Sequence, residues 1–130
     1  MTKNKILYFF KTYWRTVAWA FVIAFLSLTA GSNLPKLNWE LLSPDKFGHF
    51  TVYSLLAFLG LYDVTKSKIA FSFYTYIYVW LAATAFGFAM EWSQYFFTPD
   101  RCFEYPDMLA NALGALLGVL AFRFAIGSKN

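Results

Sequence analysis

The chain has 130 residues, of which 59% are hydrophobic and only 14% charged, and its formal net charge is +4. A soluble globular domain carries roughly 25% charged residues, so the composition predicts a single integral membrane domain over residues 1–130. The basic residues form no dense run, which argues against nucleic acid as a partner. The only cysteine, Cys102, excludes an internal disulfide and a multi-cysteine metal site.

The first predicted helix follows a basic and aromatic segment at the N-terminus. Residues 16–31 carry no charge, and with Tyr13 and Trp14 they approach the ~20 residues that a membrane span requires. We therefore predict a helix over residues 13–31. A cleaved signal peptide is the competing interpretation, because Ala30 and Ser32 are small residues at a possible cleavage site.

The second predicted helix covers residues 46–62 and follows a loop rich in helix-breaking residues. Its start is well marked, because Ser43 is a capping residue, Pro44 suits the first helical position and Asp45 complements the positive end of the helix dipole. Within this helix, only His49 and a few hydroxyl groups interrupt the apolar sequence.

Two further apolar segments predict helices over residues 69–91 and 106–125. The first of them is uncharged until it meets Glu91, which we expect in its last turn. Pro106 and Asp107 mark the start of the second. The fold class is therefore all-α, an integral membrane four-helix bundle.

Lysine and arginine in short loops predict the orientation of such a bundle, because they concentrate on the cytoplasmic side. With the N-terminus inside, the cytoplasmic side holds Lys3, Lys5, Lys11, Arg15, Lys66, Lys68, Arg123 and Lys129. The other side holds Lys36, Lys46 and Arg101. This asymmetry places both termini in the cytoplasm. In a bacterium, the protein would lie in the cytoplasmic (inner) membrane with its polar loops extracytoplasmic.

Polar residues recur on one stripe of each of the last three helices, near the ends that face outward. The stripes are Asp45, His49 and Tyr53; Gly87, Glu91 and Tyr95, with Gln94 nearby; and Asp107, Asn111, Gly114 and Gly118. Gly114 and Gly118 form a G-x-x-x-G pattern, which allows close approach of a neighbouring helix. We expect this approach to hold Asp107 and Asn111 against the bundle, where the three helix ends converge.

Three strings, DKFGHFTVYSLLAF, EWSQYFFTPDR and YPDMLANALGALLG, together resemble the VanZ-like family of membrane proteins. The resemblance covers residues 45–118, with the family pattern in the same order. Its positions here are Asp45, Lys46, His49 and Phe50; Glu91, Gln94 and Arg101; and Asp107, Asn111 and Gly114. The resemblance implies an association with reduced susceptibility to teicoplanin, a lipoglycopeptide antibiotic. It implies no particular reaction.

The candidate residues divide into two sets. The ligand-binding set is Lys46, His49, Glu91, Gln94, Arg101 and Asp107. The structural polar network is Asp45, Tyr53, Asn111, Gly114 and Gly118. Each candidate also has a structural interpretation. His49 can tie two helices, and Arg101 can be the counter-ion of Glu91 or Asp107. No metal or cofactor is predicted, because one histidine with carboxylates is a weak metal signal.

Three functions fit these residues. In the first, an outward polar pocket recognises a cell-envelope molecule, such as a lipid-linked wall precursor, or the lipoglycopeptide itself, within the membrane lipids. In the second, the protein is a small enzyme that modifies an envelope lipid or wall precursor, with His49 and Glu91 as catalytic acid and base. In the third, the polar cluster only locks the helices. We rank these in the order given.

Overall fold

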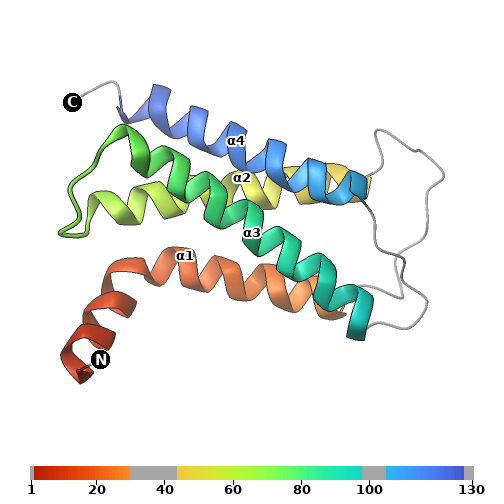
Figure 1. The fold of residues 1–130 in the computed structure, drawn as a ribbon, viewed down its shortest axis with the longest axis horizontal. Helices are drawn as coiled ribbons and strands as arrows, with labels where there is room; N and C mark the ends of the chain where they lie inside the picture. Colours follow the sequence, from red (N-terminus) through yellow and green to blue (C-terminus); the bar gives the residue numbers. More distant parts are fainter. Residues whose placement is uncertain (1, 30–43, 98–104, 128–130) are drawn as a thin grey trace.

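Four α-helices form the described part of the chain, in a computed structural model that describes residues 2–29, 44–97 and 105–127 (Figure 1). They are α1 (Lys3–Thr29), α2 (Pro44–Thr65), α3 (Phe73–Phe97) and α4 (Tyr105–Ala125). The all-α prediction is therefore confirmed. Both termini lie at the end of the bundle that holds the α2–α3 turn, which we call the terminal end. We call the opposite end the polar end.

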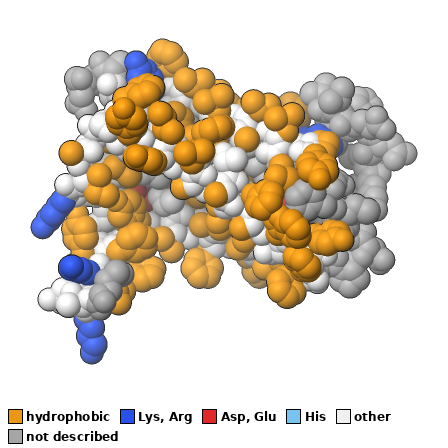
Figure 2. Space-filling view, viewed as in Figure 1, with side chains coloured by type: hydrophobic (Ala, Val, Ile, Leu, Met, Phe, Trp, Pro, Cys, Tyr) orange, Lys and Arg blue, Asp and Glu red, His pale blue; other side chains and the backbone are white. Residues whose placement is uncertain are grey.

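Three of these helices are long and apolar enough to cross a membrane: residues 46–65 of α2, and all of α3 and α4. Their outer surfaces are covered by apolar side chains, as expected of a bundle whose solvent is lipid (Figure 2). Helix α1 does not meet the same criterion within the described residues, because basic residues occupy its first half. Its crossing of the membrane stays a prediction.

The helix boundaries differ from those predicted in two informative places. Helix α1 begins at Lys3, so the basic and aromatic segment is itself helical. Helix α3 begins at Phe73 and continues to Phe97, past the predicted end at residue 91. The expectation that Glu91 occupies the last turn was wrong, because the aromatic residues beyond it extend the helix. Helix α2 begins at Pro44, as its sequence predicts.

The closest helix contact joins α2 to α4 through the two glycines of the G-x-x-x-G pattern. A methyl group on Gly114 would overlap the carbonyl oxygen of Phe50, and one on Gly118 would overlap that of Ser54. The α2 backbone therefore lies directly against this face of α4. The predicted close approach is confirmed, and it turns Asp107 and Asn111 inward, where each is 2% exposed.

Two tryptophans join the helices by hydrogen bonds in addition to packing. The indole N–H of Trp19 on α1 donates to the carbonyl of Val52 on α2 at 2.9 Å. That of Trp80 on α3 donates to the carbonyl of Ala112 on α4, also at 2.9 Å. Because a polar group in an apolar surrounding is costly unless it is hydrogen-bonded, these bonds help to fix α1 and α3 on the α2–α4 pair.

Helix α1 bends at Tyr13, whose backbone is not helical (φ −102°, ψ 19°). A helix that restarts after Tyr13 leaves its first N–H groups without intrahelical partners. The carboxylate of Asp63, on α2, accepts the N–H of Thr16 at 3.0 Å and its hydroxyl at 2.7 Å, and it pairs with Arg15 at 3.0 Å. Asp63 thus caps the second half of α1 from a neighbouring helix.

The second helix extends beyond its predicted end at residue 62. Asp63 therefore lies inside α2, where it is fully buried. A carboxylate with this degree of burial requires charged or hydrogen-bonding partners, and α1 supplies them.

Candidate functional site

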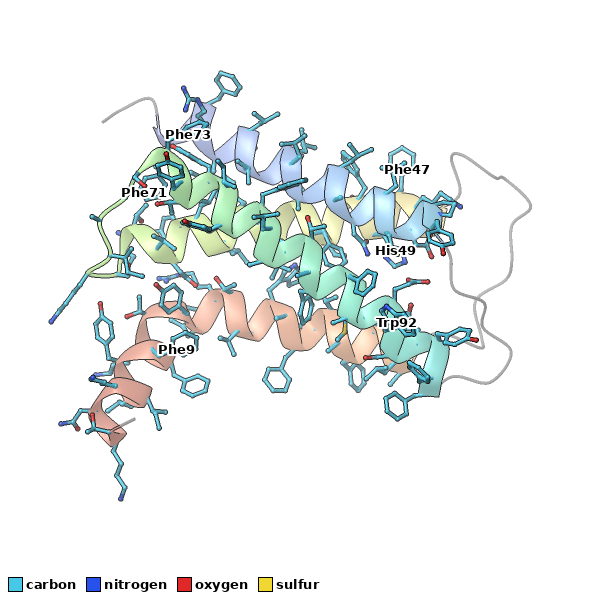
Figure 3. The ribbon with its side chains drawn as sticks, viewed as in Figure 1. Phe9, Phe47, His49, Phe71, Phe73 and Trp92 are labelled. Atoms are coloured by element: carbon cyan, nitrogen blue, oxygen red, sulfur yellow. The ribbon has the colours of Figure 1, made fainter. Side chains whose placement is uncertain are left out.

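The centre of the polar end is an imidazole held between α2 and α4. His49 Nδ1, on α2, lies 3.0 Å from Asn111 Oδ1, on α4, and Figure 3 shows the ring inside the bundle. The Asn111 oxygen only accepts, so Nδ1 is the donor. The other ring nitrogen, Nε2, lies 3.8 Å from a carboxylate oxygen of Asp107, one turn earlier on α4. The ring is thus oriented by an amide and placed beside a buried acid.

Helix α3 brings a second acid into the same region. Glu91 is 2% exposed and lies close enough to Tyr53, on α2, to act on its phenol electrostatically. One turn earlier, Gly87 allows α3 to lie close to α2 and α4. A methyl group there would lie 2.9 Å from Asn111 Nδ2 and 3.1 Å from the Tyr53 ring. Tyr53, Glu91 and Asn111 therefore share one buried layer, to which α2, α3 and α4 each contribute one residue.

Gln94 links this layer to α1, a contact that sequence reasoning missed. Its side-chain amide donates to the backbone carbonyl of Ser27, near the end of α1, at 2.7 Å. Gln94 itself is 3% exposed. A polar side chain one turn beyond Glu91 was a usable signal, but no pattern in α1 marks a single carbonyl as its partner.

Two buried acceptor atoms have no hydrogen-bond partner among the residues that the structure describes. They are Oε1 of Gln94 and Oδ1 of Asp107. Most buried polar atoms in folded proteins are hydrogen-bonded, so an orphaned acceptor needs an explanation. Both atoms can act only as hydrogen-bond acceptors. They lie at the same polar end as His49 and Glu91. Donors from outside the described residues would satisfy both atoms.

The structure brings together most of the predicted site residues. His49 contacts both Asn111 and Asp107, and the charge of Glu91 acts on the Tyr53 phenol. Lys46, one turn before His49, is partly exposed, and the structure gives it no ion pair with any described residue. Arg101 and the side chain of Asp45 lie outside the described residues, so their predicted roles stay predictions.

This arrangement limits the chemistry of the site. Within residues 2–29, 44–97 and 105–127, no group of three or more His, Cys, Asp or Glu side chains is placed to hold a metal ion. Two buried carboxylates and an amide oxygen instead favour a ligand that carries hydrogen-bond donors or positive charge. Because His49 Nδ1 donates to Asn111, the other ring nitrogen, Nε2, is the one that can accept a proton or a hydrogen bond.

Comparison with protein families gives a match over most of the chain. The family model VanZ/LLP1 matches residues 4–126, nearly the whole chain and all four helices. No match was found among curated proteins or among solved structures.

Proposed function

The chain belongs to the VanZ/LLP1 family, and from this premise we propose that its polar end recognises a cell-envelope molecule and thereby lowers susceptibility to teicoplanin. The recognition site would consist of His49, Glu91, Gln94 and Asp107, with Lys46 and Arg101 at its rim. It would face away from the cytoplasm.

The observation that carries this proposal is the pair of orphaned acceptors, Gln94 Oε1 and Asp107 Oδ1. In hydrocarbon surroundings an unsatisfied polar group costs free energy. If these two residues served only to pack helices, apolar side chains would do so without this cost. A ligand whose hydroxyl, amide or amine groups donate to these oxygens would remove the cost.

The chemistry of the rim adds a second requirement. Lys46 lies one turn before His49 and is partly exposed, and a lysine head group suits phosphate or carboxylate. The preferred ligand therefore combines donors, an anionic group and an apolar chain that lies between helices. A lipid-linked wall precursor has all three, and a lipoglycopeptide such as teicoplanin has donors and an acyl chain.

Direct binding to the purified protein tests the proposal. Teicoplanin and a lipid-linked wall precursor are titrated separately against wild type, Asp107→Asn and Arg101→Ala. We expect binding to the wild type and a loss of about tenfold or more in each variant, because each removes a charge-assisted hydrogen bond.

Ser93→Ala is the matched control, because among the described residues this hydroxyl bonds only to the carbonyl of Ala89 in its own helix. The control should bind like the wild type. Absence of binding by the wild type to either ligand would contradict the proposal.

The second candidate is an enzyme, favoured by the orientation of His49. With Nδ1 donating to Asn111, Nε2 is positioned as a proton acceptor beside Asp107, and Glu91 is a further acid in the same layer. Such a pair would serve acid–base catalysis on an envelope lipid or wall precursor. The test is the mass of lipids and wall precursors with and without expression, using His49→Ala as the inactive form. Identical profiles would eliminate this candidate for those substrates.

A further inference from the structure

The terminal end of the bundle carries positive charge that is hardly neutralised. The described basic residues at this end are Lys3, Lys5, Lys11, Arg15, Lys66, Lys68 and Arg123. Figure 2 shows several of these cationic side chains projecting from this end. The only acid among the described residues here is Asp63, which is fully buried and already paired with Arg15. Apart from Arg15, these cations have no ion pair with a described residue.

Two segments far apart in the sequence border a cavity that is open at the surface, within this charged region. It has a volume of about 490 Å³ and is lined by Asn4, Lys5 and Tyr8 of α1 and by Lys68 of the α2–α3 turn. The Tyr8 hydroxyl accepts the backbone N–H of Lys68 at 2.9 Å, and the Lys68 ammonium lies 5.6 Å from the Tyr8 ring. These contacts hold the two walls of the cavity together.

The surface of this cavity is mostly apolar, and the residues at its border carry hydrogen-bond donors. Lys5 and Lys68 each carry an ammonium group with three N–H donors and no acceptor. The Tyr8 hydroxyl uses its oxygen to accept from Lys68, so its proton is free to donate. The lining contains no carboxylate. A phosphate group, with a negative charge and several acceptor oxygens, matches this lining.

The position of the cavity identifies the source of that phosphate. The segment before Tyr13 turns away from the bundle axis (Figure 1), and its apolar residues, such as Ile6, Leu7 and Phe10, are exposed. A helix with exposed apolar residues and lysines, running across the end of a membrane bundle, lies in the interface at headgroup depth. There, the abundant phosphates belong to lipid headgroups.

We propose that the cavity between Lys5, Tyr8 and Lys68 binds the headgroup of an anionic phospholipid. The lipid phosphate accepts from the two ammonium groups and from the Tyr8 hydroxyl, while its acyl chains lie along the exposed apolar residues of α1. The bound lipid fixes the bent segment of α1 against the α2–α3 turn. This site is at the opposite end of the bundle from the envelope-recognition site.

Lipid titration of the purified protein in neutral detergent tests this proposal. The probes are phosphatidylglycerol and phosphatidylcholine, with bound lipid counted by native mass spectrometry, and inorganic phosphate as a competitor. The variant is Lys5→Ala with Lys68→Ala. The matched control is Lys3→Ala with Lys11→Ala, which removes the same charge from the same end but no residue that lines the cavity.

We expect the wild type to retain phosphatidylglycerol over phosphatidylcholine, and the cavity variant to bind phosphatidylglycerol about tenfold or more weakly than the control does. Lys5→Gln with Lys68→Gln, which keeps polar side chains, should show the same loss with unchanged helix content. Equal losses in the cavity variant and the control would overturn the proposal in favour of diffuse surface charge. Equal retention of both lipids, or displacement by equimolar inorganic phosphate, would also overturn it.

Discussion

The Nδ1 atom of His49 lies 3.0 Å from the Oδ1 atom of Asn111, so that one hydrogen bond joins α2 to α4 at the centre of the polar end. Asn111→Leu removes the acceptor and leaves a partly buried imidazole N–H without this partner. We expect a loss of about 1–2 kcal/mol in the free energy of unfolding, measured by denaturant titration in detergent.

The control for this change is Thr51→Val, since that residue is exposed and, within the described part of the chain, its hydroxyl bonds only to the carbonyl of Phe47 in its own helix. It should change the free energy of unfolding by less than about 0.5 kcal/mol. An Asn111→Leu protein as stable as the wild type would show that the His49 bond contributes nothing to holding α2 against α4.

The glycine contacts predict opposite effects of the same substitution on two helices. Gly114→Ala or Gly118→Ala forces the α4 backbone away from α2, because each methyl group meets a carbonyl of α2. Each should reduce the free energy of unfolding by about 1–3 kcal/mol. Gly48→Ala meets nothing within 4 Å, so its greater helix propensity should leave stability equal or raised by up to about 1 kcal/mol. Equal effects at all three positions would contradict this packing.

The cap that Asp63 provides to α1 predicts an order of stabilities. Asp63→Asn weakens the bonds to Arg15 and Thr16 together, and we expect a loss of about 2 kcal/mol in the free energy of unfolding. Arg15→Gln should cost less, because the Arg15 side chain is 33% exposed and both Thr16 bonds remain. Thermal unfolding of the two variants gives the order. A larger loss for Arg15→Gln would mean that the ion pair, not the cap, stabilises the bend.

The charge asymmetry predicts which end of the bundle faces the cytoplasm. Seven described basic residues lie at the terminal end, and one, Lys46, lies at the polar end. In a Cys102→Ser background, single cysteines replace Lys66 at the terminal end and Tyr105 at the polar end, both of which are exposed. A membrane-impermeant maleimide added to intact cells should label position 105 and spare position 66. The reverse labelling would invert the predicted orientation.

Much of this arrangement could be predicted from the sequence because its signals are local. The apolar runs gave the four helices, Pro44 marked the start of α2, and Gly114 and Gly118 indicated the face of α4 that meets another helix. Such signals need only the period of a helix and the properties of single residues.

Other features depended on contacts between distant segments and could not be predicted. The carbonyl of Ser27 that Gln94 binds is one backbone group among many. The burial of Asp63 depends on α1 bending at Tyr13, where neither proline nor glycine marks a break. A partial signal did exist, because a carboxylate in an apolar helix requires a cation, and Arg15 precedes the apolar part of α1.

The central claim is that the charge of Glu91 at the polar end serves ligand recognition, and Glu91→Gln tests it most directly, because the change keeps the shape of the side chain and removes its charge. The variant is scored for the free energy of unfolding in detergent and for protection against teicoplanin in a susceptible host that the wild type protects. We predict that protection is lost while the variant still folds in detergent. Full protection by the variant, or loss of stability together with protection, would contradict the claim.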